Sequence, residues 1–324
     1  MATTTKLDRN LTLEAVRVTE AGAIASYDWI GMGNEKQADQ AAVDAMRTAL
    51  NGLHIRGTVV IGEGERDEAP MLYIGEDVGL GHKAKAGPEV DIALDPLEGT
   101  TITAKGAPGA LSVMALSEKG KLLNSPDVYM DKIAVGGGLP EGVVDLDNSV
   151  SENLSNLAEA KGCAISDLSV CVLDRPRHAE IIKECREAGA RILLIPDGDI
   201  AGVIATTDPE TMVDIYIGTG GAPEGVLAAA ALRCVGGQMQ GRLVFRNNDE
   251  KERARRIGIS DLARKYSMED LAAGDVIFTA TGVTTGGMLR GVRRQHGVII
   301  TDSIVMRSKT GTIRRIEGRR RVAG

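Results

Sequence analysis

Hydrophobic and polar positions in the first half of the chain predict helices followed by short buried strands. Apolar residues recur at mostly helical spacing over residues 11–33, and Asn34 can cap a second helix that reaches about Leu50, with Gln37 at its third position. Apolar, β-branched runs bounded by turn residues predict strands at 57–62, 91–95 and 111–116. Shorter strands are predicted at 133–135 and 143–146.

From residue 168 onward the pattern alternates between strands and helices. Strands are predicted at 169–173, 191–195 and 213–217, and helices at 176–188, 200–206 and 223–234. This β-α-β-α-β-α order is typical of a parallel sheet with covering helices. We therefore predict an α+β half over residues 1–165 and an α/β half with a mainly parallel sheet over 166–324, joined as one compact two-lobed unit.

Composition and charge narrow the class of protein. The chain has 324 residues, a net charge of −7 and only 2% aromatic residues. Nucleic acid is an unsuitable partner for such a chain, because binding it needs a basic face and stacking aromatics. We expect the arginines near the C-terminus to form a solvated tail.

The location of the protein is also predicted from the sequence. No apolar run is long enough to cross a bilayer, and the polar first ten residues lack the apolar segment of a secretion signal. The four cysteines have no CxxC spacing, which favours reduced, buried thiols. These features predict a cytoplasmic protein that binds neither membrane nor nucleic acid.

Acidic residues follow two of the predicted strands. The strand at 57–62 runs into Glu63, Glu65 and Asp67, and the strand at 91–95 runs into Asp95-Pro-Leu-Glu98-Gly-Thr-Thr. Such residues can be solvated turn residues. Clustered carboxylates at the ends of buried strands are unfavourable without cations, however, and oxygen ligands suit Mg²⁺ or Mn²⁺. We predict a metal site there.

Several motifs carry a family resemblance. The Asp95-Pro-Leu-Glu-Gly-Thr100 segment resembles the signature of the lithium-sensitive, metal-dependent phosphatases. Within that superfamily the chain is similar to the bacterial class II fructose-1,6-bisphosphatases over about residues 9–317. The blocks that carry the similarity lie at 38–43, 60–65, 67–73, 175–178, 197–199 and 220–225. The resemblance implies a layered αβαβα sugar-phosphatase fold.

The resemblance also implies roles for individual residues. Implied metal ligands are Asp39, Glu63, Asp95, the Leu97 carbonyl, Glu98 and Glu224, although Asp39 taken from the sequence alone is a mid-helix residue with a structural role. Implied catalytic residues are Thr100, Glu63 and Asp67. Implied substrate-binding residues are Glu98, Gly99, Thr100, Thr101, Tyr129, Arg175, Arg177, Asp197, Asp199 and Gly221.

The implied activity is metal-dependent hydrolysis of the C1 phosphate of fructose 1,6-bisphosphate, with a homo-oligomer, dimer or tetramer, expected by family analogy. Alternatives are a dual enzyme that also accepts sedoheptulose 1,7-bisphosphate, a non-catalytic sugar-phosphate sensor on the same fold, and an inositol or 3′-phosphonucleotide phosphatase. Dehydrogenase, kinase, zinc-hydrolase and serine-hydrolase classes are disfavoured, because the GxGxxG, Walker A, HExxH and GxSxG motifs are absent from the sequence.

Overall fold

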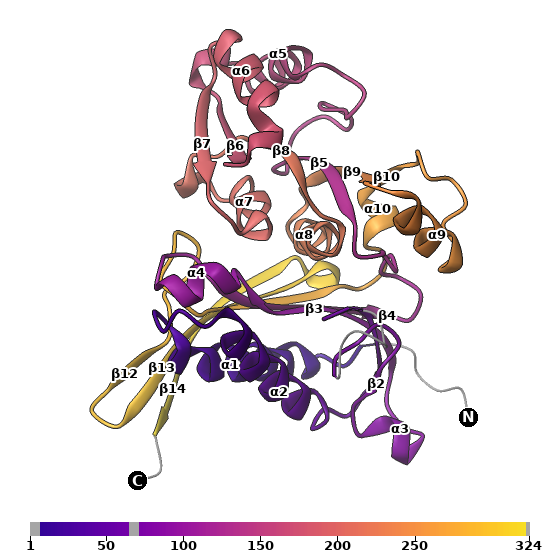
Figure 1. Ribbon diagram of the computed structural model, residues 1–324, viewed down its shortest axis with the longest axis vertical. Coiled ribbons are helices and arrows are strands. Elements are labelled where there is room, and N and C mark those ends of the chain that lie inside the picture. Colours follow the sequence, from indigo (N-terminus) through magenta and orange to yellow (C-terminus); the bar gives the residue numbers. More distant parts are fainter. Residues whose placement is uncertain (1–6, 65–70, 322–324) are drawn as a thin grey trace. The chain divides into compact units, whose positions relative to one another are not determined.

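A computed structural model of the protein describes residues 7–64 and 71–321, and its chain forms two units (Figure 1). The first unit is Met1–Leu122 together with Gly274–Gly324, and the second is Leu123–Ala273. This division differs from the predicted halves, 1–165 and 166–324. The last fifty or so residues return to the first sheet, where β11 (Ile277–Gly282) pairs with β4 (Leu111–Glu118). Such long-range pairing leaves no trace in local periodicity.

The two long helices of the first unit begin where the sequence predicts. The described helical segments of this unit, short ones included, are α1 (Leu11–Ser26), η1 (Tyr27–Trp29), α2 (Glu35–Leu50), α3 (Gly81–Ala84), α4 (Thr100–Lys105) and η5 (Ser308–Thr310). The predicted cap of α2 is confirmed, since the Gln37 backbone N–H donates to the Asn34 side chain at 3.1 Å. The first helix ends at Ser26 rather than near residue 33, because the following turns end in Gly31 and Gly33 with φ of 72° and 70°.

The sheet of the first unit is mixed. Its described strands follow the order β12-β13-β11-β4-β3-β1-β2, with β14 beside β13. The remaining bounds are β1 (Arg56–Ile61), β2 (Asp77–Val78), β3 (Glu89–Glu98), β12 (Arg293–Gln295), β13 (Val298–Arg307) and β14 (Thr312–Arg321). Only β1 and β3 are parallel among these pairs. The prediction of a solvated C-terminal tail is wrong: those arginines are exposed, but they lie on β14, which pairs with β13 along its length.

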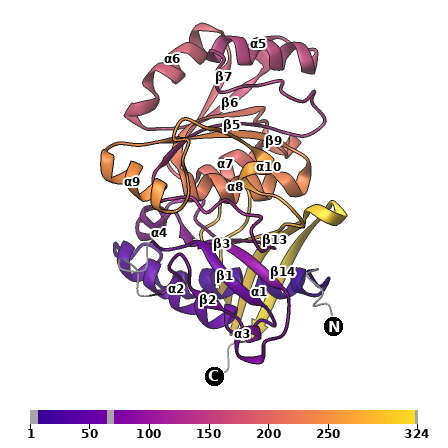
Figure 2. The same ribbon diagram turned by 90° about the vertical axis from the view of Figure 1, so that its right-hand side faces the viewer.

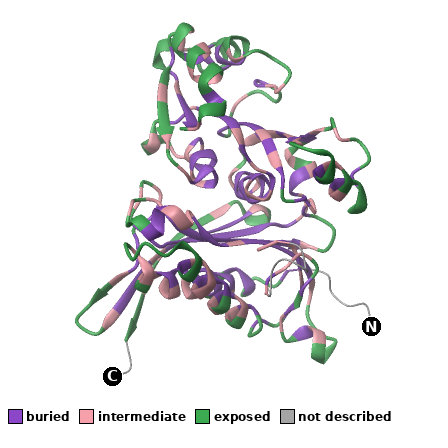
Figure 3. Cartoon of the chain, in the orientation of Figure 1, coloured by how far each residue is buried: buried purple, intermediate pink, exposed green. Residues whose placement is uncertain are grey.

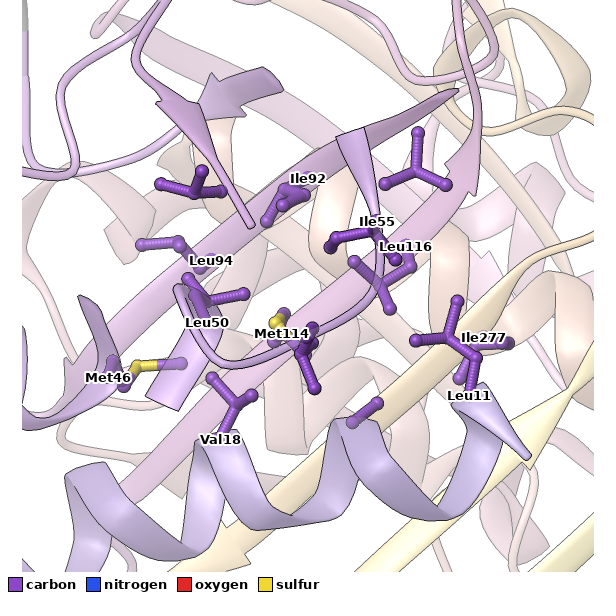
Figure 4. Close-up of a cluster of buried hydrophobic side chains, with 14 of the residues drawn as sticks. Leu11, Val18, Met46, Leu50, Ile55, Ile92, Leu94, Met114, Leu116 and Ile277 are labelled. Carbon is purple, nitrogen blue, oxygen red and sulfur yellow. The ribbon is translucent and has the colours of Figure 1, made fainter. Parts of the chain in front are cut away.

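Helices α1 and α2 cover one face of this sheet with aliphatic side chains (Figure 4). Val18 and Leu50 from the helices pack with Ile92, Met114 and Leu116 from the strands, all buried. Each such side chain contributes about 1.5–3 kcal/mol when removed from water. With only 2% aromatic residues, the chain builds this core from aliphatic side chains and methionine.

The second unit is a helix–sheet–helix sandwich. Its described strands follow the order β10-β9-β5-β8-β6-β7. The strands are β5 (Tyr129–Val135), β6 (Ser169–Leu173), β7 (Arg191–Ile195), β8 (Ile215–Gly221), β9 (Gln238–Val244) and β10 (Lys265–Ser267). Only β7, β6 and β8 run parallel; β5, β9 and β10 pair antiparallel, so this sheet is mixed rather than mainly parallel.

Helices lie on both faces of the second sheet (Figure 2). Side chains of α5 (Val150–Lys161) and α6 (Ala179–Glu187) pack with Ile133, Val170 and Ile215 on one face. The other face carries α7 (Asp199–Ala205) and α8 (Ala222–Val235). The remaining helical segments are η2 (Ile165–Asp167), η3 (Pro176–His178), η4 (Pro209–Thr211), α9 (Asn248–Arg256) and α10 (Met268–Leu271). In both units buried residues concentrate on the central strands, whereas β7, β12 and β14 are largely exposed (Figure 3). These layers confirm the predicted fold class.

The predicted strand at 143–146 is wrong. Val143 and Val144 are buried as their apolar character requires, but the segment is a turn. Its backbone bonds to a side chain rather than to a neighbouring strand, since the Leu146 N–H donates to Gln240 Oε1 at 2.9 Å. None of the described helices is long and apolar enough to span a membrane.

Candidate active site

The first unit gathers its acidic residues at the carboxyl ends of two adjacent parallel strands, β1 and β3. Both strands carry an irregularity there, before Glu63 on β1 and between Asp95 and Glu98 on β3. Val59 of β1 pairs with Ile92 of β3, and Ile61 pairs with the next residue, Ala93, so β1 has one extra residue at this point. One extra residue in a strand bends it and redirects the side chains that follow. The bend therefore comes immediately before Glu63.

The second irregularity lies between Asp95 and Glu98, which oppose Val113 and Leu111 on β4. In a regular strand, residues three apart point to opposite faces of the sheet. The extra residue removes this alternation, and one carboxylate oxygen of Asp95 and one of Glu98 lie within 4.8 Å of each other. Asp95 also accepts a hydrogen bond from the Leu97 N–H at 3.0 Å, which fixes its orientation.

Glu63 and Asp39 join these carboxylates. Burial raises the pKa of Glu63 well above its usual range, and the charges of Asp39 and Asp95 raise that pKa further. Burial likewise raises the pKa of Asp39 on α2. Carboxylates that raise one another's pKa lie close enough to repel, and repulsion of this kind is relieved when a cation binds.

The chemistry of this donor set fits a hard divalent cation. The side chains of Asp39, Glu63, Asp95 and Glu98 all offer oxygen atoms, which Mg²⁺ and Mn²⁺ prefer, whereas structural zinc is usually held by sulfur and nitrogen. Glu98 is buried, with 6% of its surface exposed. A buried carboxylate needs a compensating positive charge. The predicted ligands of this unit are therefore suited to a divalent cation.

Thr100 and Thr101 are the first two residues of α4, and only Gly99 separates them from Glu98. The turn into this helix passes through Gly99, whose φ of 91° is strongly unfavourable for other residues. The Gly99 carbonyl accepts from the Thr103 hydroxyl at 3.1 Å. Both Thr100 and Thr101 are partly exposed, so their hydroxyls are accessible beside the acidic cluster.

In the second unit, the predicted substrate-binding residues lie at one edge of the sheet. Arg175 and Arg177 follow β6, Asp197 follows β7 and Gly221 ends β8, which are the three parallel strands. Tyr129 begins β5 directly opposite Gly221. Because ligands bind at the carboxyl ends of parallel strands in α/β sheets, the order of the strands itself marks this edge as a binding site.

Guanidinium groups surround Tyr129. The guanidinium carbons, Cζ, of Arg177 and Arg246 each lie 4.9 Å from the centroid of the Tyr129 ring. Arg177 Nε donates to the Thr219 carbonyl at 2.9 Å, and Arg175 lies 3.8 Å from the Asp197 carboxylate. Paired arginines on an accessible edge are suited to bind a phosphate. The sequence did not mark Arg246 as a site residue, because it lies in a polar stretch far in sequence from Tyr129 and Arg177.

Asp199 differs from its neighbours because it is buried. Its Oδ2 lies 2.5 Å from Nζ of Lys132 on β5, and both side chains are nearly inaccessible. Sequence reasoning missed Lys132, which follows an aspartate in an otherwise ordinary strand. It also missed His178, whose Nε2 accepts from the Thr219 N–H at 2.8 Å while Nδ1 bonds the Leu173 carbonyl at 2.7 Å.

Two further predicted residues are Glu224 and Asp67. Glu224 belongs to the second unit and lies in the first turn of α8, where its carboxylate folds over Gly221; a Cβ on Gly221 would meet Glu224 Oε2 at 1.8 Å. Asp67 lies outside the described residues.

The fold and these residues define a class: an α/β metal-dependent phosphatase with an oxygen-donor cation site and an edge suited to sugar phosphates. The family model described as bacterial fructose-1,6-bisphosphatase, glpX-encoded, matches residues 9–320, and the chain belongs to this family.

Relatives support the assignment over almost the full length. The chain is 48% identical over 322 residues to fructose-1,6-bisphosphatase 1 class 2 of Escherichia coli (strain K12), covering 95% of this chain and 94% of that protein. The class 2 fructose-1,6-bisphosphatases of Escherichia coli O6:H1 and Shigella flexneri match with the same identity and coverage. Among solved structures, an extragenic suppressor from Pyrococcus furiosus aligns with a TM-score of 0.31 at 14% identity, covering 61% of this chain and 70% of that one, which is too weak to carry an argument.

Proposed function

We propose that this protein hydrolyses fructose 1,6-bisphosphate to fructose 6-phosphate and phosphate by attack at the C1 phosphate. The observation that carries the proposal is the acidic cluster that Glu63, Asp95 and Glu98 form with Asp39 of α2 at the bulged ends of β1 and β3, in a chain that matches the family over residues 9–320. Carboxylates that repel one another in a partly buried cluster are stabilised when a cation binds among them.

The proposed cofactor is Mg²⁺ or Mn²⁺. Asp39, Glu63, Asp95 and Glu98 would hold it, with the Leu97 carbonyl and Glu224 as further ligands. Bound cations of this kind supply Lewis-acid activation of water and neutralise charge on the phosphate.

The chain's own residues perform the proton transfers and the positioning in this proposal. The Thr100 hydroxyl orients the attacking water, and Glu63 or Asp67 accepts its proton. As the new oxygen–phosphorus bond forms in line, the bond to the C1 oxygen breaks, and that oxygen takes up a proton as it leaves. The Gly99 amide and the Thr101 hydroxyl donate to the scissile phosphate, and the Glu98 carboxylate, which only accepts, would meet it through the bound cation.

Residues of the second unit would bind the remainder of the substrate. Arg175 and Arg177 donate to the second phosphate, Tyr129 contacts the sugar phosphate beside them, and Asp197 and Asp199 accept from sugar hydroxyls. The Gly221 backbone contacts the substrate, and its missing side chain leaves room for the Glu224 carboxylate. We further propose that the protein acts in the cytoplasm as a homo-oligomer, a dimer or a tetramer.

The test is phosphate release from fructose 1,6-bisphosphate with Mg²⁺, with Mn²⁺ and after chelation. Fructose 6-phosphate, inositol 1-phosphate and sedoheptulose 1,7-bisphosphate are assayed alongside. Glu63→Gln is compared with Glu141→Gln, an exposed glutamate of the second unit. We expect metal-dependent release from fructose 1,6-bisphosphate that Glu63→Gln alone abolishes.

Other outcomes have definite meanings. Comparable release from the seven-carbon bisphosphate establishes the dual activity. Tight binding of the bisphosphate without turnover under either metal would overturn the proposal in favour of a sugar-phosphate sensor.

A further inference from the structure

The second unit buries a lysine that the proposed reaction does not use. Lys132 lies in the middle of β5, has 1% of its surface exposed, and pairs with Asp199 Oδ2 at 2.5 Å. Removing two charges from water costs free energy that their mutual attraction often fails to recover, and apolar replacements of buried pairs are often neutral or stabilising. Stability alone therefore does not explain why the pair is there.

Glycines flank this ion pair on the adjoining strands. Lys132 opposes Gly218 on β8 and Gly241 on β9, so that both cross-strand neighbours lack a side chain. A Cβ at Gly220 would meet Asp199 Oδ2 at 2.0 Å and Lys132 Nζ at 3.1 Å. Gly220 therefore makes room for the Asp199 carboxylate, whereas a Cβ at Gly218 or Gly241 would first meet His178 or Met130.

The partner of Lys132 lies at the substrate edge. Asp199 is the first residue of α7. It follows Gly198, whose φ of 83° turns the chain from Asp197 into this helix. A carboxylate has two oxygens, so one bound to Lys132 leaves the other able to accept from a hydroxyl.

We propose that Lys132 is a positioning residue that orients Asp199 as the acceptor for a sugar hydroxyl of the substrate. This inference rests on the proposed function. Because the contact is to the sugar and not to the scissile phosphate, it contributes equally to substrate and transition state, and its loss raises KM rather than lowering kcat.

The test compares Lys132→Met with Lys265→Met. Lys265 lies on β10 of the same sheet and also pairs with aspartates, Asp145 and Asp147. We expect Lys132→Met to raise KM for fructose 1,6-bisphosphate about tenfold or more, as expected for loss of a hydrogen bond to a charged group, with kcat changed by less than about threefold. Lys265→Met should keep the wild-type KM.

A merely structural role would give a different result. It would lower the fraction of active enzyme, and so the apparent kcat, while the KM of the remaining active molecules stayed at the wild-type value. The double variant Lys132→Met with Asp199→Asn covers the case in which the single variant fails to fold, because it leaves no buried charge unpaired. We expect this double variant to be folded and to show the raised KM.

Wild-type KM in both Lys132 variants would overturn the inference while leaving the enzyme assignment intact. Absence of metal-dependent turnover in the wild-type protein would instead overturn the proposed function itself. The two failures are therefore distinguishable.

Discussion

Gly62 links the packing of the first unit to the placement of Glu63. A Cβ at this position would lie 2.0 Å from the Leu72 carbonyl oxygen and 2.8 Å from Val59 Cγ1. The same Leu72 carbonyl accepts the Glu63 N–H at 3.1 Å. Since φ at Gly62 is outside the left-handed region, steric contact is the reason that glycine is required here.

The substitution Gly62→Ala therefore forces the backbone apart. Ordinary contact begins near 3.4 Å, so the two segments must separate by more than about 1 Å. Overpacking of this kind costs about 1–3 kcal/mol, and each kcal/mol lowers the melting temperature of a domain of this size by about 2–4 °C. A displacement of about 1 Å at a catalytic group lowers turnover about 100-fold.

Thermal unfolding and phosphate release from fructose 1,6-bisphosphate measure both effects. The matched control is Gly287→Ala in the same unit, because a Cβ there has nothing within 4 Å and its φ is also outside the left-handed region. We expect the control to melt and react like the wild type. If Gly62→Ala does the same, the steric connection from Gly62 to Glu63 is refuted.

Three further predictions concern single residues. In chelator, Glu63→Gln should melt at a higher temperature than the wild type, because the substitution removes repulsion among carboxylates. With metal the order should reverse, because the variant loses most of the stabilisation by bound metal, about 2.7 kcal/mol at a hundredfold excess over Kd. Calorimetry in chelator and in Mn²⁺ that shows no such reversal would count against the metal site. Thr100→Ser should retain more phosphatase activity than Thr100→Ala, and equal rates would remove the hydroxyl from the mechanism. Burial and the nearby Arg177 charge lower the pKa of His178 from 6.5, so its contribution to stability is complete above pH 6.5 and is lost as the pH falls through the lowered folded pKa. Unfolding measured across this range should show that component in the wild type and not in His178→Gln.

The sequence by itself determined the local elements and the family's motifs. The Asn34 cap, the strands around Val59, Ile92 and Val113, and the β-α alternation after residue 168 all follow from short-range periodicity and turn chemistry, which act between residues a few positions apart. Carboxylates after two buried strands likewise marked Glu63, Asp95 and Glu98 as a candidate metal site. The parallel pairing of β1 and β3, which brings those strand ends to one edge, came only with the fold.

Only the tertiary structure decided which distant segments meet. The return of β11 and β13 to the first sheet, the antiparallel placement of β5 between β8 and β9, and the Lys132–Asp199 pair join residues far apart in sequence. The bulges at the ends of β1 and β3 depend on the register against a partner strand, which no single strand's pattern contains. Pairing partners and register are selected by the total burial and hydrogen bonding of the folded chain, so they are absent from local sequence.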